Sequence, residues 1–318
     1  MPKLSIIIVN WNSGPQLRAC LTSIAAAGKG GLDLLPVVVV DNASSDTSLE
    51  GIENLGVSVH IVRNSRNRGF AAACNQGAAE SRADYLLFLN PDTILYPASL
   101  ASPVEFMERH ENLDIGIVGI QLVDDAGEVS RTCARFPTVS GIFARMIGLD
   151  RLLPARFPSH FISEWDHSAS RYVDEVIGAF FLVRHSYFEI LGGFDERFFV
   201  YFEELDFSLR ARQSGWRSFY LADARAYHKG GGTSEQVKAM RLFYFLRSRI
   251  LYGYKHFGRL TATALTIGTL LLEPLPRLFV GAARCSGKDI AETLLGYLCL
   301  WRDIPVILKT ALTGDRSP

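Results

Sequence analysis

Apolar runs of strand length alternate with helical patterns through the first ninety residues of the chain. Apolar, β-branched or leucine-rich runs at residues 4–10, 36–42, 57–62 and 85–90 each predict a strand. Between them, residues 15–24 and 69–82 carry helical patterns, the second unusually rich in small side chains. Alternation of this kind predicts an α/β fold with a mainly parallel sheet and right-handed crossovers.

Two helix starts are expected from local signals. Ser13 is placed to cap a helix with Pro15 in its first turn, and Leu17, Leu21 and Ile24 share one face of that helix. The hydroxyl-rich segment after Asn42, "ASSDTSLEGI", suits another helix start.

The remainder of the chain divides into three stretches. The pattern weakens from residue 91 to about 172, where prolines 137, 154 and 158 favour loops, short helices and an edge strand. Residues 176–228 predict a strand, a helix, a Gly-Gly turn, an aromatic cluster, a second helix and a short strand. After residue 233 the pattern is helical.

Composition narrows the class of protein. The 318 residues include 33 basic and 33 acidic side chains, so net charge gives no argument for nucleic-acid binding, and no nucleic-acid partner is expected. The five cysteines have no paired spacing, which favours reduced thiols in a cytoplasmic protein. The apolar run near the N-terminus spans only residues 4–9 and is expected to be a strand, not a secretory signal.

Polar side chains follow three of the predicted strands. Asn10, Asp41 and Asn90 each stand where a buried run ends, and the carboxyl ends of parallel strands meet at one edge of a sheet, where ligands bind. For Asp41 alone, capping of the next helix is the simpler interpretation. Three polar strand ends on one sheet favour a binding crevice.

The stretch "RNRGFAAACN", residues 66–75, predicts a helix that begins after Gly69. Backbone N–H groups at such a helix start favour an anion, and small side chains allow a close approach. Tight packing of an alanine-rich helix on the sheet explains the same residues, and the two interpretations are compatible. The chain contains neither GxGxxG nor GxxxxGK[ST], so dinucleotide and P-loop sites are not supported.

Asp92 and His228 are candidate ligands for a divalent cation. Asp92 follows the strand 85–90 within "NPDT", a sequence that also suits a plain turn. A carboxylate there, facing a phosphate-binding helix start, suits a cation that bridges protein and diphosphate. His228 follows a predicted strand and precedes Lys229 and three glycines. A lone histidine is more often structural, but this position favours a ligand.

Three acids open a helix in "FFVYFEELDFSLR", residues 198–210. Glu203, Glu204 and Asp206 are favoured there by the helix dipole alone. The four aromatic residues that precede them predict an apolar wall that desolvates one carboxylate, which raises its pKa and makes it a better general base.

In order along the chain, several stretches together resemble family 2 glycosyltransferases, in particular the rhamnosyltransferase-like branch of bacterial surface polysaccharide synthesis. The matching stretches are "SIIIVNWNSGPQLRACLTSI", "VVVVDNASSD", "RNRGFAAACNQG", "FLNPDT", "GAFFLVRHSYFEILGGFDERFFVYFEELDFSLR" and "AYHKGGGTS". They lie between residues 5 and 234.

The resemblance implies a GT-A fold and an inverting, metal-dependent hexosyltransferase. Its donor would be a nucleotide-diphosphate sugar, dTDP-rhamnose or a UDP-sugar, with Mg²⁺ or Mn²⁺ as cofactor. Its acceptor would be a hydroxyl of a glycan or of a polyprenyl-diphosphate-linked sugar. The expected domains are a catalytic domain at 1–235, with a nucleotide-binding half at 1–92 and an acceptor half at 93–235, and a helical region at 236–318.

The resemblance also assigns roles to residues. Asp41 would pair with the pyrimidine base, Asp92 and His228 would hold the metal, and Glu204 would be the base, with Glu203 and Asp206 as alternatives. Here "NPD" replaces the family's DxD motif, with Asn90 near the ribose or phosphate. The donor side comprises Val9, Asn10, Trp11, Asp41, Asn67, Gly69, Asn75 and Asn90. The acceptor side comprises Gly178, Gly193 and Asp195.

The C-terminal third has two interpretations. Six basic residues and six aromatic residues interleave between positions 238 and 259, and an uncharged run at 260–272 follows. That run is too short to span a bilayer but suits an interfacial anchor on the inner face of the cell membrane. Packing on the catalytic domain or on a second protomer of a homo-oligomer is the alternative. For the whole protein, a non-catalytic sugar-nucleotide-binding assembly subunit and a sugar-nucleotide pyrophosphorylase are the competing functions.

Overall fold

The computed structural model describes residues 1–28, 30–230 and 238–314. The chain separates into two compact units, here called the sheet unit and the helical unit. The sheet unit comprises Met1–Arg135, Phe161–Asp195 and Glu204–Thr233, and the helical unit Phe136–His160, Glu196–Glu203 and Ser234–Pro318. The boundary predicted at residues 235–236 lies outside the described residues. The structure assigns two earlier segments to the helical unit, which sequence patterns did not separate.

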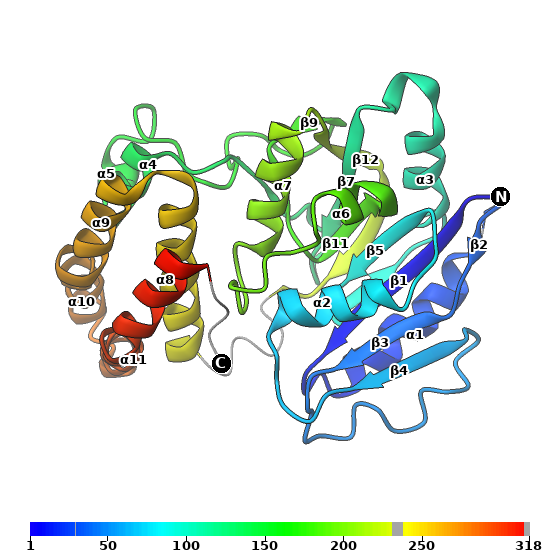
Figure 1. Cartoon of the computed structure of the whole chain (residues 1–318), viewed down its shortest axis with the longest axis horizontal. Coiled ribbons are helices and arrows are strands. Elements are labelled where there is room, and N and C mark those ends of the chain that lie inside the picture. Colours follow the sequence, from blue (N-terminus) through cyan, green and yellow to red (C-terminus); the bar gives the residue numbers. More distant parts are fainter. Residues whose placement is uncertain (29, 231–237, 315–318) are drawn as a thin grey trace. The chain divides into compact units, whose positions relative to one another are not determined.

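Ten strands of the described residues form the main sheet of the sheet unit (Figure 1). Eight of them follow the order β4-β3-β1-β5-β11-β7-β12-β6, while β2 pairs with β1 and β9 with β12. The strands are β1 Lys3–Asn10, β2 Asp33–Leu34, β3 Val37–Asp41, β4 Val59–Arg63, β5 Tyr85–Leu89, β6 Thr93–Leu95, β7 Ile115–Val123, β9 Arg171–Val173, β11 Phe180–Arg184 and β12 Arg217–His228. Two short strands, β8 Cys133–Ala134 and β10 Glu175–Val176, pair separately.

The sheet is mainly parallel, as predicted. Strands β4, β3, β1 and β5 are mutually parallel, and β7 is parallel to β12. β11 runs antiparallel between β5 and β7, and β6 and β9 are antiparallel to β12. The carboxyl ends of β1, β3 and β5 therefore open at one edge of the sheet.

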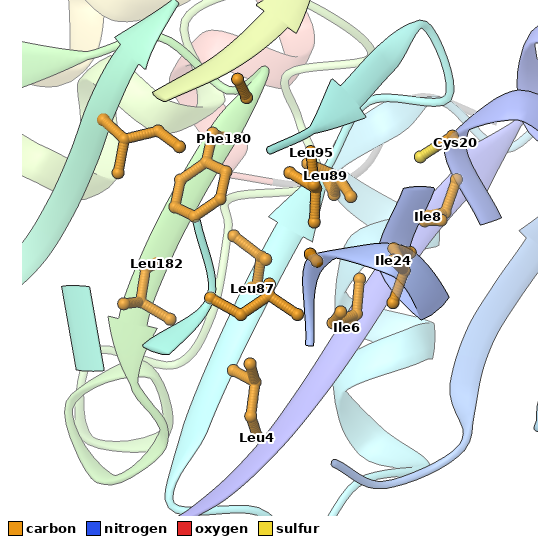
Figure 2. Close-up of a cluster of buried hydrophobic side chains, with 14 of the residues drawn as sticks. Leu4, Ile6, Ile8, Cys20, Ile24, Leu87, Leu89, Leu95, Phe180 and Leu182 are labelled. Atoms are coloured by element: carbon orange, nitrogen blue, oxygen red, sulfur yellow. The ribbon is translucent and has the colours of Figure 1, made fainter. Parts of the chain in front are cut away.

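Helices cover both faces of this sheet because alternate strand residues point to opposite sides. Leu4, Ile6 and Ile8 of β1 lie in one core cluster with residues of α1 (Pro15–Ala27), and Figure 2 shows Ile6 beside Ile24 and Ile8 beside Cys20. The intervening β1 residues pack with α2 (Phe70–Ala79) on the other face. α3 (Ala101–Glu108) belongs to the α1 face, followed by a short 3-10 turn, His110–Asn112. α6 (His185–Ile190) and α7 (Glu203–Gln213) lie on the α2 face.

Three local predictions are wrong. No helix lies in the described residues between β3 and β4, and the hydroxyls of Ser44 and Ser48 there accept from Asn10 of β1 instead of capping a helix. Gly14, not Ser13, is the N-cap of α1. The weakly patterned region holds β7, whose nine residues are all buried in mid-sheet. A strand buried on both faces shows no alternation, and glycines 116 and 119 interrupt its apolar run.

The helical unit confirms the helical C-terminal region. Its helices are α4 Val139–Met146, α5 Leu149–Leu152, α8 Lys238–His256, α9 Arg259–Ile267, the π turn η3 Gly268–Leu272, α10 Pro274–Ala283 and α11 Gly287–Thr313. α8 is the buried helix of this unit and packs against α9 and α11. Its Arg247 and Arg249 are buried, so the basic residues of 238–259 are not all available to a membrane surface.

Candidate functional site

Asn10 and Asp41 meet at the carboxyl edge of the sheet, as the strand pattern predicted. They are paired in the register of β1 and β3, and Asn10 Nδ2 donates to Asp41 Oδ1 at 2.8 Å. The same Nδ2 lies 2.9 Å from Ser48 Oγ and 3.1 Å from Ser44 Oγ, and Ser13 Oγ donates to Asn10 Oδ1. This network fixes the buried Asp41 carboxylate at the edge.

Trp11 is exposed at this edge. It lies between buried Asn10 and half-buried Asn12, and the left-handed φ of 50° at Asn12 turns the chain. Asn12 Oδ1 accepts from Ser45 N at 2.8 Å, which fixes the turn. Val9 lies buried one residue before Asn10, facing α2. An exposed indole beside an ordered carboxylate suits stacking on a planar base.

The loop before α2 is held by two asparagines. Asn67 Oδ1 accepts from Gly69 N at 2.9 Å, and Asn42 Nδ2 donates to Gly69 O at 3.0 Å. Asn42 Oδ1 also accepts from Arg68 N at 3.3 Å. Sequence reasoning missed Asn42, although it directly follows Asp41 and carries the same signal of a polar strand end.

The start of α2 suits an anion. Its N-cap Gly69 makes no side-chain capping bond, and the first turn contains no acid. Arg63, Arg66 and Arg68 precede it and are exposed. The small side chains bring α2 close to the sheet: a Cβ on Gly77 would lie 2.5 Å from Ile7 Cγ2. Open N–H groups with neighbouring cations form the arrangement that binds phosphate.

Asn75 holds the backbone of Phe194 through both polar atoms of its amide. Its Oδ1 accepts from Phe194 N at 2.9 Å and its Nδ2 donates to Phe194 O at 2.8 Å. Gly193 is required at this contact, because its φ is 71° and a Cβ would lie 2.7 Å from Asn75 Oδ1. Asn75 and Gly193 thus position the loop that ends at half-buried Asp195. The donor and acceptor contacts expected of them from the sequence stay predictions.

Asp92 and His228, the two predicted cation ligands, lie together. β6 and β12 are antiparallel with Thr93 opposite His228, and His228 Nε2 lies 3.3 Å from Asp92 Oδ1. The side chains are 9% and 11% exposed, so both are largely withdrawn from water. No group of three or more His, Cys, Asp or Glu forms a metal cluster in the described chain. The glycines at 231 and 232 lie outside the described residues.

Two protein ligands are compatible with a divalent cation at a diphosphate. Magnesium in such sites commonly takes one or two carboxylates, with phosphate oxygens and water completing its coordination. An imidazole beside the carboxylate also accommodates manganese. Asp92 and His228 thus fit a cation that arrives with a nucleotide diphosphate.

Glu204 lies beside the strand end that leads to Asp92. Gly178 N–H donates to the Glu204 carboxylate. The carbonyl oxygen of the next residue, Ala179, accepts from Asn90 N at 3.0 Å. This backbone hydrogen bond places Asn90 next to the residue that follows Gly178. Burial raises the pKa of Glu204, and the N–H groups of Glu204 itself and of Gly178 oppose that rise by stabilising the carboxylate. Its Oε2 is buried without a hydrogen-bond partner in the described structure.

The other two acids differ in their surroundings. Asp206 is fully buried and accepts from Arg210 Nε at 2.8 Å. Arg210 also donates to Leu191 O and Gly193 O, so this ion pair organises the Gly-Gly loop. Glu203 is buried and belongs to the helical unit. These environments favour Glu204 as the base.

The predicted aromatic wall has a packing role. Phe199 stacks on Tyr244 of α8 at 4.6 Å, and Phe202 contacts Phe245 and Tyr252, each at 5.4 Å between ring centroids. These contacts lie within the helical unit. The rings of Phe199 and Phe202 therefore pack against α8. Their desolvation of the base stays a prediction.

Residues 5–162 match the family model described as "Glycosyl transferase family 2". The N-acetylglucosaminyl-diphospho-decaprenol L-rhamnosyltransferase of Mycobacterium tuberculosis is 24% identical over 80% of this chain and 85% of its own length. Rhamnosyltransferase WbbL of Escherichia coli is 29% identical over 56% of this chain and 67% of its own.

Solved structures share the fold at low identity. The mannosyltransferase PcManGT of Pyrobaculum calidifontis, in complex with GDP-Man and Mn²⁺, is 17% identical, with a TM-score of 0.54 over 98% of this chain and 86% of its own. GalNAc-T7, with UDP, GalNAc and Mn²⁺, is 15% identical, with a TM-score of 0.55 over 80% of this chain and half of its own. The GT-A fold expected from the sequence is confirmed.

Proposed function

The chain belongs to glycosyltransferase family 2, and we propose that it is an inverting, metal-assisted enzyme that transfers a hexose from a nucleotide-diphosphate donor. The proposed acceptor is a hydroxyl of a glycan or of a polyprenyl-diphosphate-linked sugar at the cytoplasmic face of the membrane. Rhamnose is the proposed sugar, because two relatives are named for its transfer and one of them for a diphospho-decaprenol substrate.

One observation carries the proposal. The 3.0 Å bond from Asn90 N to Ala179 O brings the segment ending in Asp92 beside Gly178, whose N–H contacts Glu204. The segment that carries the candidate metal ligand and the glycine that binds the candidate base thus adjoin the same end of the paired strands β5 and β11. In a displacement reaction, the leaving group and the base that activates the nucleophile lie on opposite sides of the reacting carbon.

The donor is proposed to lie along the carboxyl edge of the sheet. Trp11 and Asp41 would hold the base, with Asp41 reading its polar edge and the indole stacking on its plane. The open N–H groups after Gly69 would take a phosphate, next to Asn67. Asn90 would lie near the ribose or the phosphate, one strand from Asn10.

Asp92 and His228 are the proposed holders of Mg²⁺ or Mn²⁺. When bound there, the cation would stabilise negative charge on the departing diphosphate as a Lewis acid. The protein's own contribution is to keep both ligands 3.3 Å apart and shielded from water, which strengthens their hold on a cation.

Glu204 is the proposed general base. It would take the proton of the acceptor hydroxyl as that oxygen attacks the anomeric carbon of the donor. Its raised pKa makes the carboxylate more basic, while the Gly178 N–H keeps it in place and preserves its charged form. General-base catalysis contributes roughly 10²- to 10⁴-fold to such a step.

Replacing the proposed base tests the chemistry. Glu204→Gln is expected to bind the nucleotide with unchanged affinity and to lose about 10²- to 10⁴-fold in kcat. Glu203→Gln is the matched neighbour and is expected to keep most of its turnover. Wild-type turnover in Glu204→Gln, or the large loss in Glu203→Gln instead, would reassign the base.

Replacing the proposed metal ligand tests donor binding. Asp92→Ala is expected to abolish the gain in nucleotide-diphosphate affinity that magnesium or manganese produces in calorimetry. Asp223→Ala, which removes an exposed acid from the same β12 that carries His228, is the control and is expected to retain that gain. An unchanged metal effect in Asp92→Ala removes this residue from the cation site.

An assay of donor hydrolysis distinguishes the proposed transferase from the competing function, a non-catalytic sugar-nucleotide-binding subunit. A transferase with a base and a metal site is expected to hydrolyse a nucleotide sugar slowly in the presence of metal and in the absence of acceptor. Tight nucleotide binding without hydrolysis or transfer, across a panel of nucleotide sugars and acceptors, would favour the binding subunit.

A further inference from the structure

An apolar stripe runs along the surface of the helical unit from α9 to α10. Large apolar side chains at 260, 267, 271, 275 and 279 are exposed, and small exposed alanines at 264 and 282 continue the series. The spacing of three, four or seven residues places them on one side of the helical segment. Together they form a surface called here the α9–α10 stripe.

The opposite side of the same segment is buried, and it carries a row of polar residues beside the apolar Ala262 and Leu265. Thr266, Thr269 and Glu273 are all buried inside the helical unit. Arg249 of α8 donates to Thr269 Oγ1 at 2.9 Å and pairs with Glu273, which also accepts from Arg277 at 2.7 Å. The larger apolar side chains therefore face outward, whereas the apolar side of a typical helix in a water-soluble protein faces the core.

The charges around the stripe have one sign. Between Arg259 and Lys288 the single acid of the sequence is Glu273, which is buried and paired. Arg259 at the start of α9 and Arg284 and Lys288 beyond α10 are exposed. The stripe is therefore flanked at both ends by cations with no exposed acid between them, which complements an anionic surface.

We propose that the α9–α10 stripe docks on an anionic lipid bilayer, with its apolar side chains in the headgroup–acyl boundary. Exposed leucine, isoleucine and phenylalanine over basic ends are the composition of an interfacial helix. The surface is defined only by the exposure and the charge of its residues, and it does not depend on which sugar is transferred. Its biological purpose rests on the proposed function, because a lipid-linked acceptor would be presented at such a surface.

The segment lies in the interface and does not cross the bilayer. Arg259–Ala283 is, by length and composition, the one described helix that is long and apolar enough to cross a membrane. Its polar side, however, is bound to α8 through the Arg249–Glu273 pair, and α8 carries further basic residues. Crossing would place those charges in hydrocarbon at a large energetic cost, whereas lying flat leaves them above it.

Vesicle flotation of the full chain tests the docking. The wild type is expected to float with vesicles of phosphatidylcholine and phosphatidylglycerol, and more weakly with phosphatidylcholine alone. The test variant is Leu275→Gln/Phe279→Gln, whose side chains are 64% and 74% exposed. The control is Leu113→Gln/Ile190→Gln, whose side chains in the sheet unit are 50% and 69% exposed.

The stripe variant is expected to lose about tenfold in vesicle partition for each side chain that leaves the lipid, while the control floats like the wild type. Arg284→Glu/Lys288→Glu is expected to lose binding to anionic vesicles only, by at least about fivefold per residue. Equal flotation of the stripe variant and the control overturns the proposal. So does a wild-type dimer in solution that the stripe variant alone dissociates, because a second copy would then cover this surface.

Donor hydrolysis measured on the same proteins separates this proposal from the proposed function. Both double-glutamine variants are expected to hydrolyse nucleotide sugar at the wild-type rate, since none of the four residues lies in the site. If flotation depends on the stripe but none of the proteins hydrolyses or transfers the sugar, the docking proposal stands and the proposed enzymatic function is refuted. If the proteins hydrolyse the donor but flotation does not depend on the stripe, the enzymatic function stands and the docking proposal is refuted.

Discussion

Gly192 and Gly193 offer a sharp test of how the candidate site is supported. The two neighbours have nearly the same left-handed backbone, with φ of 74° and 71°. A Cβ on Gly192 would meet nothing within 4 Å, whereas a Cβ on Gly193 would lie 2.7 Å from Asn75 Oδ1. Alanine at either position carries the same backbone penalty, about 1–2 kcal/mol. The difference between the two variants therefore isolates the contact with Asn75.

The magnitude follows from the geometry of that contact. Asn75 Oδ1 accepts from Phe194 N at 2.9 Å, so an oxygen pushed away from residue 193 leaves that hydrogen bond. Losing a buried bond of this kind costs about 1–3 kcal/mol. Gly193→Ala is thus expected to unfold with a free energy about 2 kcal/mol lower than Gly192→Ala. In melting temperature the difference is about 4–8 °C for a domain of this size.

Thermal and urea unfolding followed by circular dichroism measure this difference. Repeating both substitutions in an Asn75→Ala background completes a double-mutant cycle, because this background lacks the oxygen that the new Cβ would contact too closely. There the gap between the two alanine variants is expected to shrink to a few tenths of a kcal/mol, with the Phe188 ring, 3.3 Å from the Cβ position, as the remaining contact. Equal stability of Gly192→Ala and Gly193→Ala in the wild-type background would refute the reasoning.

Three further predictions follow from buried polar groups. Burial, together with the charges of Glu204 and Asp174, raises the pKa of Glu175 well above its usual value, so its contribution to stability is present at low pH and lost as pH rises through the folded-state pKa. Glu175→Gln cannot ionise and should gain in melting temperature over the wild type as pH rises above the unfolded-state pKa of a glutamate, about 4.3; parallel curves would contradict this. Arg210→Ala removes the partner of buried Asp206 and should lower the free energy of unfolding by about 3–5 kcal/mol, measured in urea, with a small effect arguing against the ion pair. Asn42→Ala frees the loop before α2 and should weaken nucleotide affinity by about tenfold in calorimetry, since one buried hydrogen bond of about 1–2 kcal/mol is lost; unchanged affinity would separate this loop from the donor.

The sequence predicted the strand ends of the site well, for a physical reason. Buried parallel strands are continuous apolar runs, so the polar residue that ends each run marks the sheet edge. Asn10 and Asp41 were found in this way and are hydrogen bonded to each other. Asp92 and His228 were placed by the same logic and lie 3.3 Å apart.

The sequence did not indicate bonds between side chains and partners that are distant along the chain. Asn75 was predicted only as a donor contact, and its amide is also bonded to Phe194, 119 residues away. The serines after β3 were taken for helix caps, whereas Ser44 and Ser48 bond to Asn10. Short polar side chains bond equally well to local and remote groups, so the sequence pattern alone does not choose between them.

The aromatic residues before Glu204 have a structural role that the sequence pattern did not indicate. Tyr201 and Phe202 have left-handed φ values of 68° and 72°, a conformation that costs about 1–2 kcal/mol for each such residue. Phe202 packs against Phe245 and Tyr252, and aromatic contacts of this kind contribute about 0.5–1.5 kcal/mol each beyond their buried area. The rings therefore offset the strain of the turn from which α7 starts. The aromatic residues next to the acids stabilise that turn. The turn itself fixes the start of α7, the helix that carries Glu204.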